Sequence, residues 1–301
     1  MIAILTGGLS DERQVALKSA DNIRNIVEQA GFETRTFVLP EQLDEFLLAR
    51  HVVTCAIPVF HGPWGEDGVI QGFLETLQIP YLFSGVGAHA LGMDKRKTKI
   101  LLATQGMPVA HDMLVPRGAE WPDWPQPVVI KPVASGSSFN VHLCRTADEY
   151  EAAKEACSKS SADFMVEELI EGDEYTVGVV DRNGKPEVLP VVAIKPKTAF
   201  FDLEAKYDPS KCEEICPAPI SEESSERLKS LALLAHTGIG ARHLSRSDFI
   251  VGKDGTVTFL EINTIPGFTQ ASLLPKELLA ANIDASGLFK EWIEETTTAR
   301  R

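Results

Sequence analysis

Two acidic side chains near the C-terminus, Asp248 and Glu261, have a spacing that predicts a metal site. They lie in the segment 246–263, where two alternating apolar runs flank the pair Asp254-Gly255. This dipeptide is favoured in two-residue hairpin turns. If these two residues form the turn, counting outward places Asp248 directly opposite Glu261. Facing carboxylates repel each other, so the arrangement indicates a cation between them or a shared proton. For a cation, their hard oxygen atoms favour Mg²⁺.

The same register adds two polar groups to this face of the hairpin. Arg246 falls opposite Asn263, and side chains two residues apart along a strand point to the same side. The Asn263 carbonyl can supply a further metal ligand, and Arg246 is suited to a phosphate or to negative charge that develops during a reaction. The alternative is a solvated hairpin whose carboxylates simply pair with Arg246. Turns of another length would also change the register.

A phosphate-binding group is indicated at the end of the apolar strand 128–130. Lys131 follows this strand, and Gly136, Ser137 and Ser138 form a short loop beside it. Ammonium, hydroxyl and backbone N–H groups can together surround a phosphate. The P-loop spacing G-x-x-x-x-G-K-[ST] does not occur in the sequence, which argues against that class of nucleotide-binding protein. Taken alone, the loop can also be an ordinary turn.

Other residues are candidates for nucleotide and substrate contacts. Glu167, Glu168 and Glu174 bracket the next strands, where carboxylates can accept hydrogen bonds from ribose hydroxyls or an adenine amino group. A Gly-Gly turn near the N-terminus precedes a helix, whose positive end can hold a substrate carboxylate. His61 follows an apolar strand in a glycine-rich loop, a common position for a site residue. Each feature also has a purely structural interpretation: solvated strand ends, a structural turn and a neutral histidine.

These residues are distributed over three regions with different sequence patterns. Residues 1–91 alternate strands and helices as a parallel α/β unit does, beginning with an apolar strand at 2–5. Residues 92–172 begin with a basic helix and pass through a Pro- and Trp-rich stretch into the strand before Lys131. Residues 173–301 contain further strands and the hairpin. The pattern predicts an α/β (α+β) fold of two or three domains with an N-terminal parallel sheet.

The composition excludes several classes of protein. The chain of 301 residues has 43 acidic and 29 basic side chains and a formal net charge of −14, which repels nucleic acid and anionic membranes. No membrane-spanning apolar run and no secretory signal are recognisable. The 5 cysteines have no paired spacing, so neither a disulfide framework nor a structural zinc site is expected. We expect a cytoplasmic protein with small-molecule partners.

Eight motifs follow one another along the chain: GGLSDERQVAL, HGPWGEDGVIQGFLE, SGVGAHALGMDK, VVIKP with SGSS, VEELIEGDEYTV, FDLEAKY, RSDF and LEINTIPGFTQASLLP. Their order resembles the D-alanine:D-alanine ligase family of the ATP-grasp enzymes, and the resemblance runs essentially from end to end. It implies a three-domain ATP-grasp architecture, with ATP held between two antiparallel sheets of the central and C-terminal domains. It also implies two Mg²⁺ or Mn²⁺ ions, two amino-acid substrates and a homodimer.

The resemblance assigns roles to individual residues. Those assigned to ATP are Lys95, Lys131, Ser137, Ser138, Glu167, Glu168, Ile170, Glu174 and Lys206. Those assigned to the metal ions are Asp248, Glu261 and Asn263. Those assigned to the amino-acid substrates are His61, Ser272 and Leu273. Those assigned to catalysis are Gln14, Ser137, Tyr207, Arg246, Gly267 and Ser272.

These roles imply an ATP-dependent ligase that forms D-alanyl-D-alanine for peptidoglycan precursor synthesis. A carboxylate of the first amino acid attacks the γ-phosphate, which gives an acyl phosphate and ADP, and the amine of the second amino acid then displaces phosphate. Arg246 and the backbone near Gly267 would stabilise the oxyanion. Lys206 and Tyr207 belong to a loop that is expected to close over the site and exclude water.

The sequence departs from the family pattern at a position that bears on the substrate. Gln14 is expected where the family has a glutamate whose charge holds the ammonium of the first amino acid. Ser135, Asn140 and Leu203 also differ from the family's usual residues. The departures leave two alternatives. One is a ligase of the same fold with another amino-acid or hydroxy-acid substrate, and the other is a nucleotide-binding paralogue that catalyses no reaction.

Overall fold

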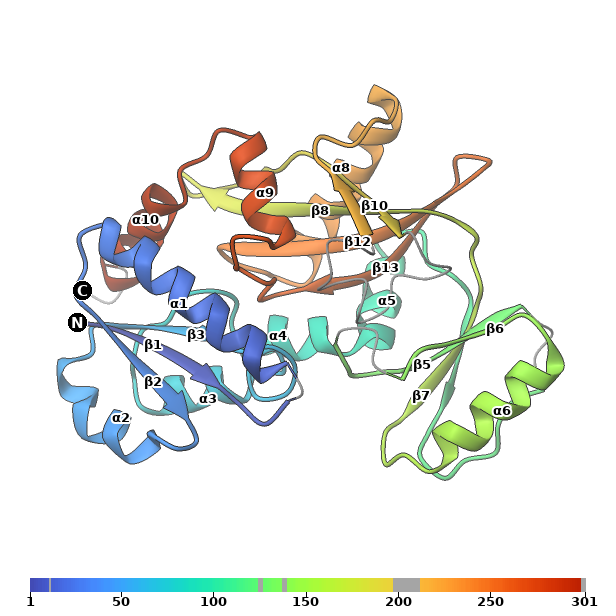
Figure 1. Ribbon diagram of the computed structural model, residues 1–301, viewed down its shortest axis with the longest axis horizontal. Helices are drawn as coiled ribbons and strands as arrows, with labels where there is room; N and C mark the ends of the chain where they lie inside the picture. The colour runs from blue at the N-terminus through green and yellow to red at the C-terminus, as the bar shows by residue number, and fades with distance from the viewer. Residues whose placement is uncertain (11, 124–126, 137–139, 197–211, 299–301) are drawn as a thin grey trace.

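The protein is built on three β-sheets, one parallel and two antiparallel (Figure 1). The computed structural model describes residues 1–10, 12–123, 127–136, 140–196 and 212–298. This mixed α/β architecture confirms the fold class expected from the sequence. None of the helices in these ranges combines the length and the apolar composition that crossing a membrane requires.

The N-terminal sheet is parallel and has the strand order β2-β1-β3. Its strands are β1 (Ile2–Gly7), β2 (Thr34–Leu39) and β3 (Cys55–Val59). The helices of this region are α1 (Arg13–Gln29), α2 (Leu43–Ala49), the short 3-10 helix η1 (Arg50–Val52), α3 (Val69–Thr76) and α4 (Val86–Met93). All residues of β1 are buried, because helices cover both faces of a parallel sheet.

A tight turn after β1 directs the chain into α1. Gly7 has a φ of 104°, and a Cβ atom at this position would lie 2.5 Å from the Leu39 carbonyl oxygen. Only glycine fits both the positive φ and this close approach. The turn therefore places the N-terminal end of α1 at the carboxyl edge of the parallel sheet, where ligands of open α/β sheets commonly bind.

The central sheet is antiparallel and has the order β4-β7-β5-β6. Its strands are β4 (Asp112–Val115), β5 (Val128–Pro132), β6 (His142–Cys144) and β7 (Phe164–Glu168). One face is covered by α6 (Ala147–Ser158), which begins with a capping box formed by Thr146 and Glu149. A small apolar core lies beneath this helix and includes Val128, Ile130 and Val166.

The C-terminal sheet is also antiparallel, with the order β11-β10-β8-β12-β13 and β9 paired to β8. Its strands are β8 (Gly172–Arg182), β9 (Lys185–Val188), β10 (Val192–Pro196), β11 (Cys212–Ile215), β12 (Leu244–Gly252) and β13 (Val257–Asn263). The helices of this region are α8 (Glu222–Gly238), α9 (Leu273–Ala280) and α10 (Ala285–Thr298). The apolar side of α8 packs on β8 and β12 and forms the core of the domain.

Helix α5 (Lys95–Ala103) lies between the two antiparallel sheets (Figure 1). It begins at Asp94, whose carboxylate accepts a hydrogen bond from the Lys97 amide and so caps the helix. Lys95 and Lys99 are four residues apart, so their side chains project from the same face of the helix. One helix can therefore contact groups on both sheets.

The N-terminal and C-terminal regions share one apolar core. Ile4 of β1 and Ile23 of α1 belong to the same buried cluster as Leu274 of α9, Phe289 and Trp292 of α10. The parallel sheet and the central sheet fall inside the expected ranges 1–91 and 92–172. Helix α4 and strand β8 each cross one expected boundary, so the boundaries themselves stay a prediction.

Candidate active site

The β12–β13 hairpin places four polar residues as the sequence predicts. Asp248 pairs with Glu261 and Arg246 pairs with Asn263 in the antiparallel register. Strand β12 is paired on its other side with β8, where Thr176 lies opposite Asp248. Asp248 therefore lies on an interior strand of the sheet and Glu261 on the adjacent edge strand, and neither is at the tip of the hairpin. The predicted register is confirmed.

The turn that led to this register was predicted wrongly, and a bulge compensates for the error. The loop contains three residues between Gly252 and Thr256, because the Gly252 amide donates to the Thr256 carbonyl at 2.9 Å. Gly255 has a φ of 82°, which is typical of the glycine that ends a three-residue hairpin loop. The extra loop residue shifts the pairing by one, and Leu260 shifts it back as a β-bulge between Phe259 and Glu261.

Two cavities meet at these carboxylates. The first has a volume of about 350 Å³ and lies between the central and C-terminal sheets. The second has a volume of about 760 Å³ and is bounded by α1, β13 and the segment before α9. The residues that line both cavities are Ile194, Asp248 and Glu261. A ligand in one cavity can therefore react with a ligand in the other beside these carboxylates.

The oxygen atoms around Asp248 and Glu261 suit a hard divalent cation. Asp248 accepts hydrogen bonds from Arg246 at 3.0 Å, from the Thr176 hydroxyl at 2.5 Å and from the Asn263 amide nitrogen at 3.2 Å. Glu261 is paired with the Lys95 ammonium at 3.1 Å. Because Asn263 uses its nitrogen toward Asp248, its oxygen is available as a ligand. Two carboxylates and an amide oxygen are typical ligands of Mg²⁺.

The metal site stays a prediction, although its donor set fits. Within the residues that the structure describes, no cluster of three or more His, Cys, Asp and Glu side chains is arranged to hold a metal ion. The candidate ligands include only two carboxylates, which is common for Mg²⁺ that also binds substrate phosphates. Asp248, Glu261 and Asn263 would then share the cation with the oxygen atoms of a triphosphate.

Arg246 keeps its positive charge although it is buried. Burial alone would lower the pKa of its guanidinium, but the adjacent Asp248 and Glu261 carboxylates raise it above the usual value. Two nitrogen atoms of the guanidinium contact the two Asp248 oxygen atoms, each at 3.0 Å, which fixes the plane of the group. Arg246 also lines the second cavity, where it can face a transferred phosphoryl group.

A buried carboxylate between two lysines forms one wall of the first cavity. Lys131 Nζ donates to Glu167 Oε1 at 3.1 Å, and Lys99 donates to Glu167 Oε2. Burial would raise the pKa of Glu167, but the Lys131 and Lys99 ammonium groups outweigh it and hold the pKa below the usual value. Glu167 is therefore ionised, and the cluster of three groups carries one net positive charge beside the cavity.

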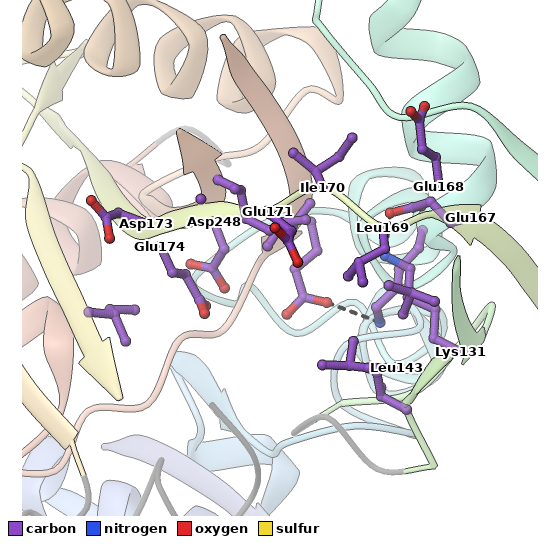
Figure 2. Close-up of a pocket in the computed structure, with 18 of the residues that line it drawn as sticks. Lys131, Leu143, Glu167, Glu168, Leu169, Ile170, Glu171, Asp173, Glu174 and Asp248 are labelled. Carbon is purple, nitrogen blue, oxygen red and sulfur yellow. Dashed lines mark hydrogen bonds and ion pairs between the residues drawn. The ribbon is translucent and has the colours of Figure 1, made fainter. Parts of the chain in front are cut away.

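The other predicted nucleotide contacts within the described residues, Lys95, Glu168, Ile170 and Glu174, also line the first cavity. Figure 2 shows Lys131 and Leu143 on one side of this cavity and Glu174 and Asp248 on the other. The Ile170 side chain belongs to the segment that crosses between the two sides. The Glu168 side chain is exposed and points away from the other labelled groups. The position of Glu168 suits a contact at the rim rather than inside the cavity.

The second cavity contains the residues predicted to bind the amino acids. His61, Gly267, Ser272 and Leu273 all line it. The Ser272 hydroxyl accepts a hydrogen bond from the Thr269 amide at 3.0 Å, and Ser272 is the N-cap residue of α9. Burial lowers the pKa of His61, so its imidazole is neutral at neutral pH. The cavity thus offers neutral hydrogen-bonding groups and a helix N-terminus for small polar ligands.

The predicted role of Gln14 is corrected by the structure. Gln14 is exposed on α1 and lines neither cavity. Glu12, at the start of the helix, lines the second cavity and carries the negative charge that Gln14 lacks. A Cβ atom on Gly136 would lie 2.5 Å from Glu12 Oε2, so this carboxylate approaches the Gly/Ser loop of the central domain. A helix turns through about 100° per residue, so side chains two positions apart point in nearly opposite directions. Glu12 can therefore face the cavity while Gln14 faces solvent.

Three further charged residues near the site were not found by sequence reasoning. Burial raises the pKa of Glu66 to about 8, and its carboxyl accepts a hydrogen bond from the Gly62 amide at 2.8 Å. Burial also raises the pKa of Glu277 well above its usual value, beneath Arg246. Lys99 is the third. The His61 motif and the spacing from Lys95 were the available signals for Glu66 and Lys99, whereas Glu277 has no sequence signal.

Four of the predicted site residues lie outside the described part of the chain. They are Ser137, Ser138, Lys206 and Tyr207. Their predicted contacts with phosphate and their role in closing the site stay predictions.

A charged cavity walled by two antiparallel sheets, with carboxylates of the C-terminal sheet at one end, is the defining feature of the ATP-grasp class. Comparisons with known proteins identify the family within this class. Residues 118–294 match the family model described as D-ala D-ala ligase C-terminus. The D-alanine--D-alanine ligase of Desulfotalea psychrophila is 39% identical over 97% of this chain and 94% of its own length. That of Oleidesulfovibrio alaskensis is 36% identical over 97% of this chain and 95% of its own length.

The fold agrees with the sequence relatives. The crystal structure of a D-alanine--D-alanine ligase from Bacillus anthracis complexed with ATP has a TM-score of 0.85 and 29% identity, and it covers 99% of this chain and 98% of its own. The VanG D-Ala:D-Ser ligase of Enterococcus faecalis has a TM-score of 0.83 and 26% identity over 98% of both chains. The chain belongs to the D-alanine–D-alanine ligase family.

Proposed function

We propose that the protein is an ATP-dependent ligase that joins two D-alanine molecules through an acyl-phosphate intermediate and so supplies peptidoglycan synthesis. The observation that carries the proposal is the position of Asp248 and Glu261 at the junction of the two cavities. A nucleotide in the first cavity and an amino acid in the second would meet there. The family membership supports D-alanine as the substrate.

The charges of the first cavity suit a triphosphate. Lys95 and Lys131 both line it, and Lys99 offsets the charge of Glu167, so the positive charge of Lys131 is left for a phosphate. Mg²⁺ bound by Asp248, Glu261 and Asn263 would neutralise phosphate oxygen atoms and favour the attack of a carboxylate on the γ-phosphate. The Glu174 carboxylate, farther along the same cavity, can accept hydrogen bonds from ribose hydroxyls.

The second cavity would hold the two amino acids in order. Glu12 at the start of α1 provides the negative charge for the ammonium of the first amino acid. The N-terminus of α9 at Ser272 provides the positive end of a helix for the carboxylate of the second. Arg246 lines the same cavity and contacts Asp248, so it can stabilise the negative charge of the phosphoryl group and of the tetrahedral intermediate.

Identification of the product tests this function directly. The protein would be incubated with ATP, Mg²⁺ and D-alanine, and the products would be separated by mass spectrometry. We expect D-alanyl-D-alanine, ADP and phosphate in equal amounts, because one ATP activates one carboxylate. A product that requires D-serine, a hydroxy acid or another acceptor in place of D-alanine would contradict the substrate assignment.

A second measurement separates a ligase from a nucleotide-binding protein without catalysis. ATP binding would be measured by calorimetry, and ADP release would be followed with each amino acid. ATP binding with no amino-acid-dependent ADP release would contradict the ligase proposal. The alternative of a different first substrate was based on the missing charge at Gln14. Glu12 lines the second cavity and provides that charge, which favours an amino acid as the first substrate.

Two properties of the whole protein belong to this proposal. We propose a homodimer and a cytoplasmic location, in line with the family resemblance and with the net charge of −14. Light scattering after gel filtration would determine the oligomeric state. A monomer that is fully active at all concentrations would contradict the dimer.

A further inference from the structure

A lysine that lies behind the first cavity has no role in the ligase reaction as described above. Lys99 is 1% exposed and is among the largest fully buried side chains of the protein. It does not line the cavity, whereas Lys131 and Glu167 do. Burial lowers the pKa of Lys99 to about 8, so the ammonium is still charged at neutral pH. A buried charge of this kind is kept only where it has a specific partner.

The partner of Lys99 is the oxygen atom of Glu167 that Lys131 does not use. Lys99 contacts Oε2 and Lys131 contacts Oε1 at 3.1 Å. The neighbouring carboxylate on the central sheet is Asp112, which is paired with Glu167 across β4 and β7. Asp112 is neutralised by Arg96 at 2.6 Å. The direct contact of Lys99 is with Glu167, which it neutralises from the side opposite the cavity, and Asp112 adds only a weaker attraction.

The two lysines of this cluster have different freedom to move. Lys131 borders the cavity, so its ammonium can turn toward a bound phosphate. Lys99 is enclosed, and α5 also carries Lys95, which is paired with Glu261 on the other sheet at 3.1 Å. The helix thus fixes both lysines between the two sheets. When Lys131 leaves Glu167 for a phosphate, Lys99 remains as a counter-ion.

We propose that Lys99 is a positioning residue for ATP binding: it neutralises the buried Glu167 permanently and thereby allows Lys131 to turn from this carboxylate to the phosphates. Without Lys99, ATP could recruit Lys131 only by leaving a buried carboxylate unpaired. Breaking a buried ion pair in this way is strongly unfavourable, because it leaves an uncompensated buried charge. The inference rests on the proposed use of ATP, but not on the identity of the amino acids.

The first test compares two substitutions in α5. Lys99→Met keeps the length of the side chain and removes its charge, whereas Lys97→Met changes an exposed lysine of the same helix that pairs with Asp94. ATP affinity would be measured by calorimetry and the KM of the amino acid by ADP release. We expect Lys99→Met to weaken ATP binding at least about 10-fold and to leave the amino-acid KM unchanged, while Lys97→Met behaves as wild type. Equal ATP affinity of Lys99→Met and wild type would overturn the inference.

A second variant separates charge neutralisation from a merely structural role. In the wild-type background, Glu167→Gln changes a residue of the cavity wall and should weaken ATP binding. In the Lys99→Met background, the same substitution removes the carboxylate charge that ATP would leave unpaired, so it should strengthen ATP binding. A purely structural Lys99 would give weakening in both backgrounds, and this result would refute the proposal.

Two further measurements distinguish a folding defect of Lys99→Met from a failure of the proposed function. If Lys99→Met alone does not fold, the double variant Lys99→Met/Glu167→Gln must bind ATP as Glu167→Gln does, since Lys99 then has nothing to neutralise. A further loss in the double variant would contradict the inference. Wild-type protein that binds no ATP would contradict the proposed function itself, which is a different outcome.

Discussion

The C-terminal sheet contacts its two neighbours in opposite ways. Toward the N-terminal domain it shares an apolar core, in which Trp292 stacks on His243 with ring centroids 5.3 Å apart. Toward the central domain it faces a cavity lined by charged groups, and α5 contributes an ion pair between Lys95 and Glu261. One interface is filled by side chains and the other is open to a ligand.

The difference between the two interfaces indicates which one stabilises the fold and which one rearranges when substrate binds. At the filled interface, Arg242 donates to the carbonyls of Tyr81 and Phe83 at 3.1 and 3.0 Å, and the Phe83 amide donates to His243 Nδ1 at 2.9 Å. Such contacts fix the N-terminal sheet relative to β12. At the open interface Lys95 pairs with Glu261 and Lys131 with Glu167, and a bound phosphate can rearrange these ion pairs. Changes there should affect catalysis, whereas changes at the filled interface should affect stability.

The largest effect is expected at the junction of the cavities. Glu261→Ala should lower turnover at least about 10⁴-fold, because it removes a metal ligand and a metal supplies several kcal/mol of transition-state stabilisation. Steady-state ADP release measures this loss. Glu155→Ala, on the exposed side of α6, is the matched control and should keep full activity. Retained activity in Glu261→Ala would exclude this carboxylate from the reaction.

The filled interface should respond in stability. Trp292 is 1% exposed and donates to the Asp181 carbonyl at 2.7 Å, so Trp292→Ala should cost about 3–5 kcal/mol of unfolding free energy. Urea unfolding followed by circular dichroism gives this value. Leu279→Ala, at a side chain that is 78% exposed, should change it by less than about 0.5 kcal/mol. Equal unfolding free energies of Trp292→Ala and Leu279→Ala would mean that the shared apolar core does not stabilise this interface.

Arg246 tests whether geometry matters beside charge. Arg246→Lys keeps the positive charge but cannot contact both Asp248 oxygen atoms, so kcat should fall about 10²-fold with little change in ATP affinity. Single-turnover kinetics would separate the chemical step from ATP binding. An unchanged rate constant for this step would show that a point charge is sufficient.

A smaller effect distinguishes Glu12 from Gln14. Glu12→Gln should raise the KM of the first amino acid about 10-fold, because it removes the ionic part of one contact. Gln14→Glu should leave this KM unchanged, because the side chain faces solvent. Initial rates at varied D-alanine concentration give both values. A lower KM in Gln14→Glu would restore Gln14 to the substrate site.

The smallest effect concerns pH and the filled interface. Burial and the Arg242 guanidinium lower the pKa of His243 to about 3, from an ordinary 6.5. The neutral imidazole is therefore favoured in the folded protein, and its contribution to stability is present above pH 6.5 and is lost as the pH falls toward 3.

His243→Asn should weaken this dependence on pH. Asparagine tolerates the φ of 68° at this position and can accept the Phe83 hydrogen bond, but it does not titrate. Between about pH 7.5 and pH 5.5, the wild type should lose about 1 kcal/mol more than the variant. Urea midpoints at both pH values measure the difference. Equal losses in both proteins would mean that His243 does not contribute.

The sequence predicts the polar hairpin well because local rules largely determine it. Alternating apolar residues and a turn dipeptide define two paired strands, and Asp248 pairs with Glu261 as expected. The three-residue loop and the bulge at Leu260 could not be predicted, since each depends on how β13 fits its neighbours. The two deviations cancel, so the predicted register holds although the predicted turn does not.

Long-range contacts explain what the sequence could not predict. Glu12 and Gln14 are both polar and lie at the start of one helix, and only the packing of α1 decides which of them lines the cavity. Lys99 and Glu167 are far apart in sequence and meet inside the protein. Glu277 resembles an ordinary helix residue until α9 packs against β8, where the Gly178 amide donates to its carboxyl at 2.6 Å.

The most direct test of the central claim follows one oxygen atom. D-Alanine labelled with ¹⁸O in its carboxylate would be supplied with ATP and Mg²⁺, and the released phosphate would be analysed by mass spectrometry. If a carboxylate in the second cavity attacks the γ-phosphate of a nucleotide in the first, each released phosphate carries one ¹⁸O atom. Unlabelled phosphate accompanying dipeptide would show that water, not the amino acid, receives the phosphoryl group, and would contradict the account.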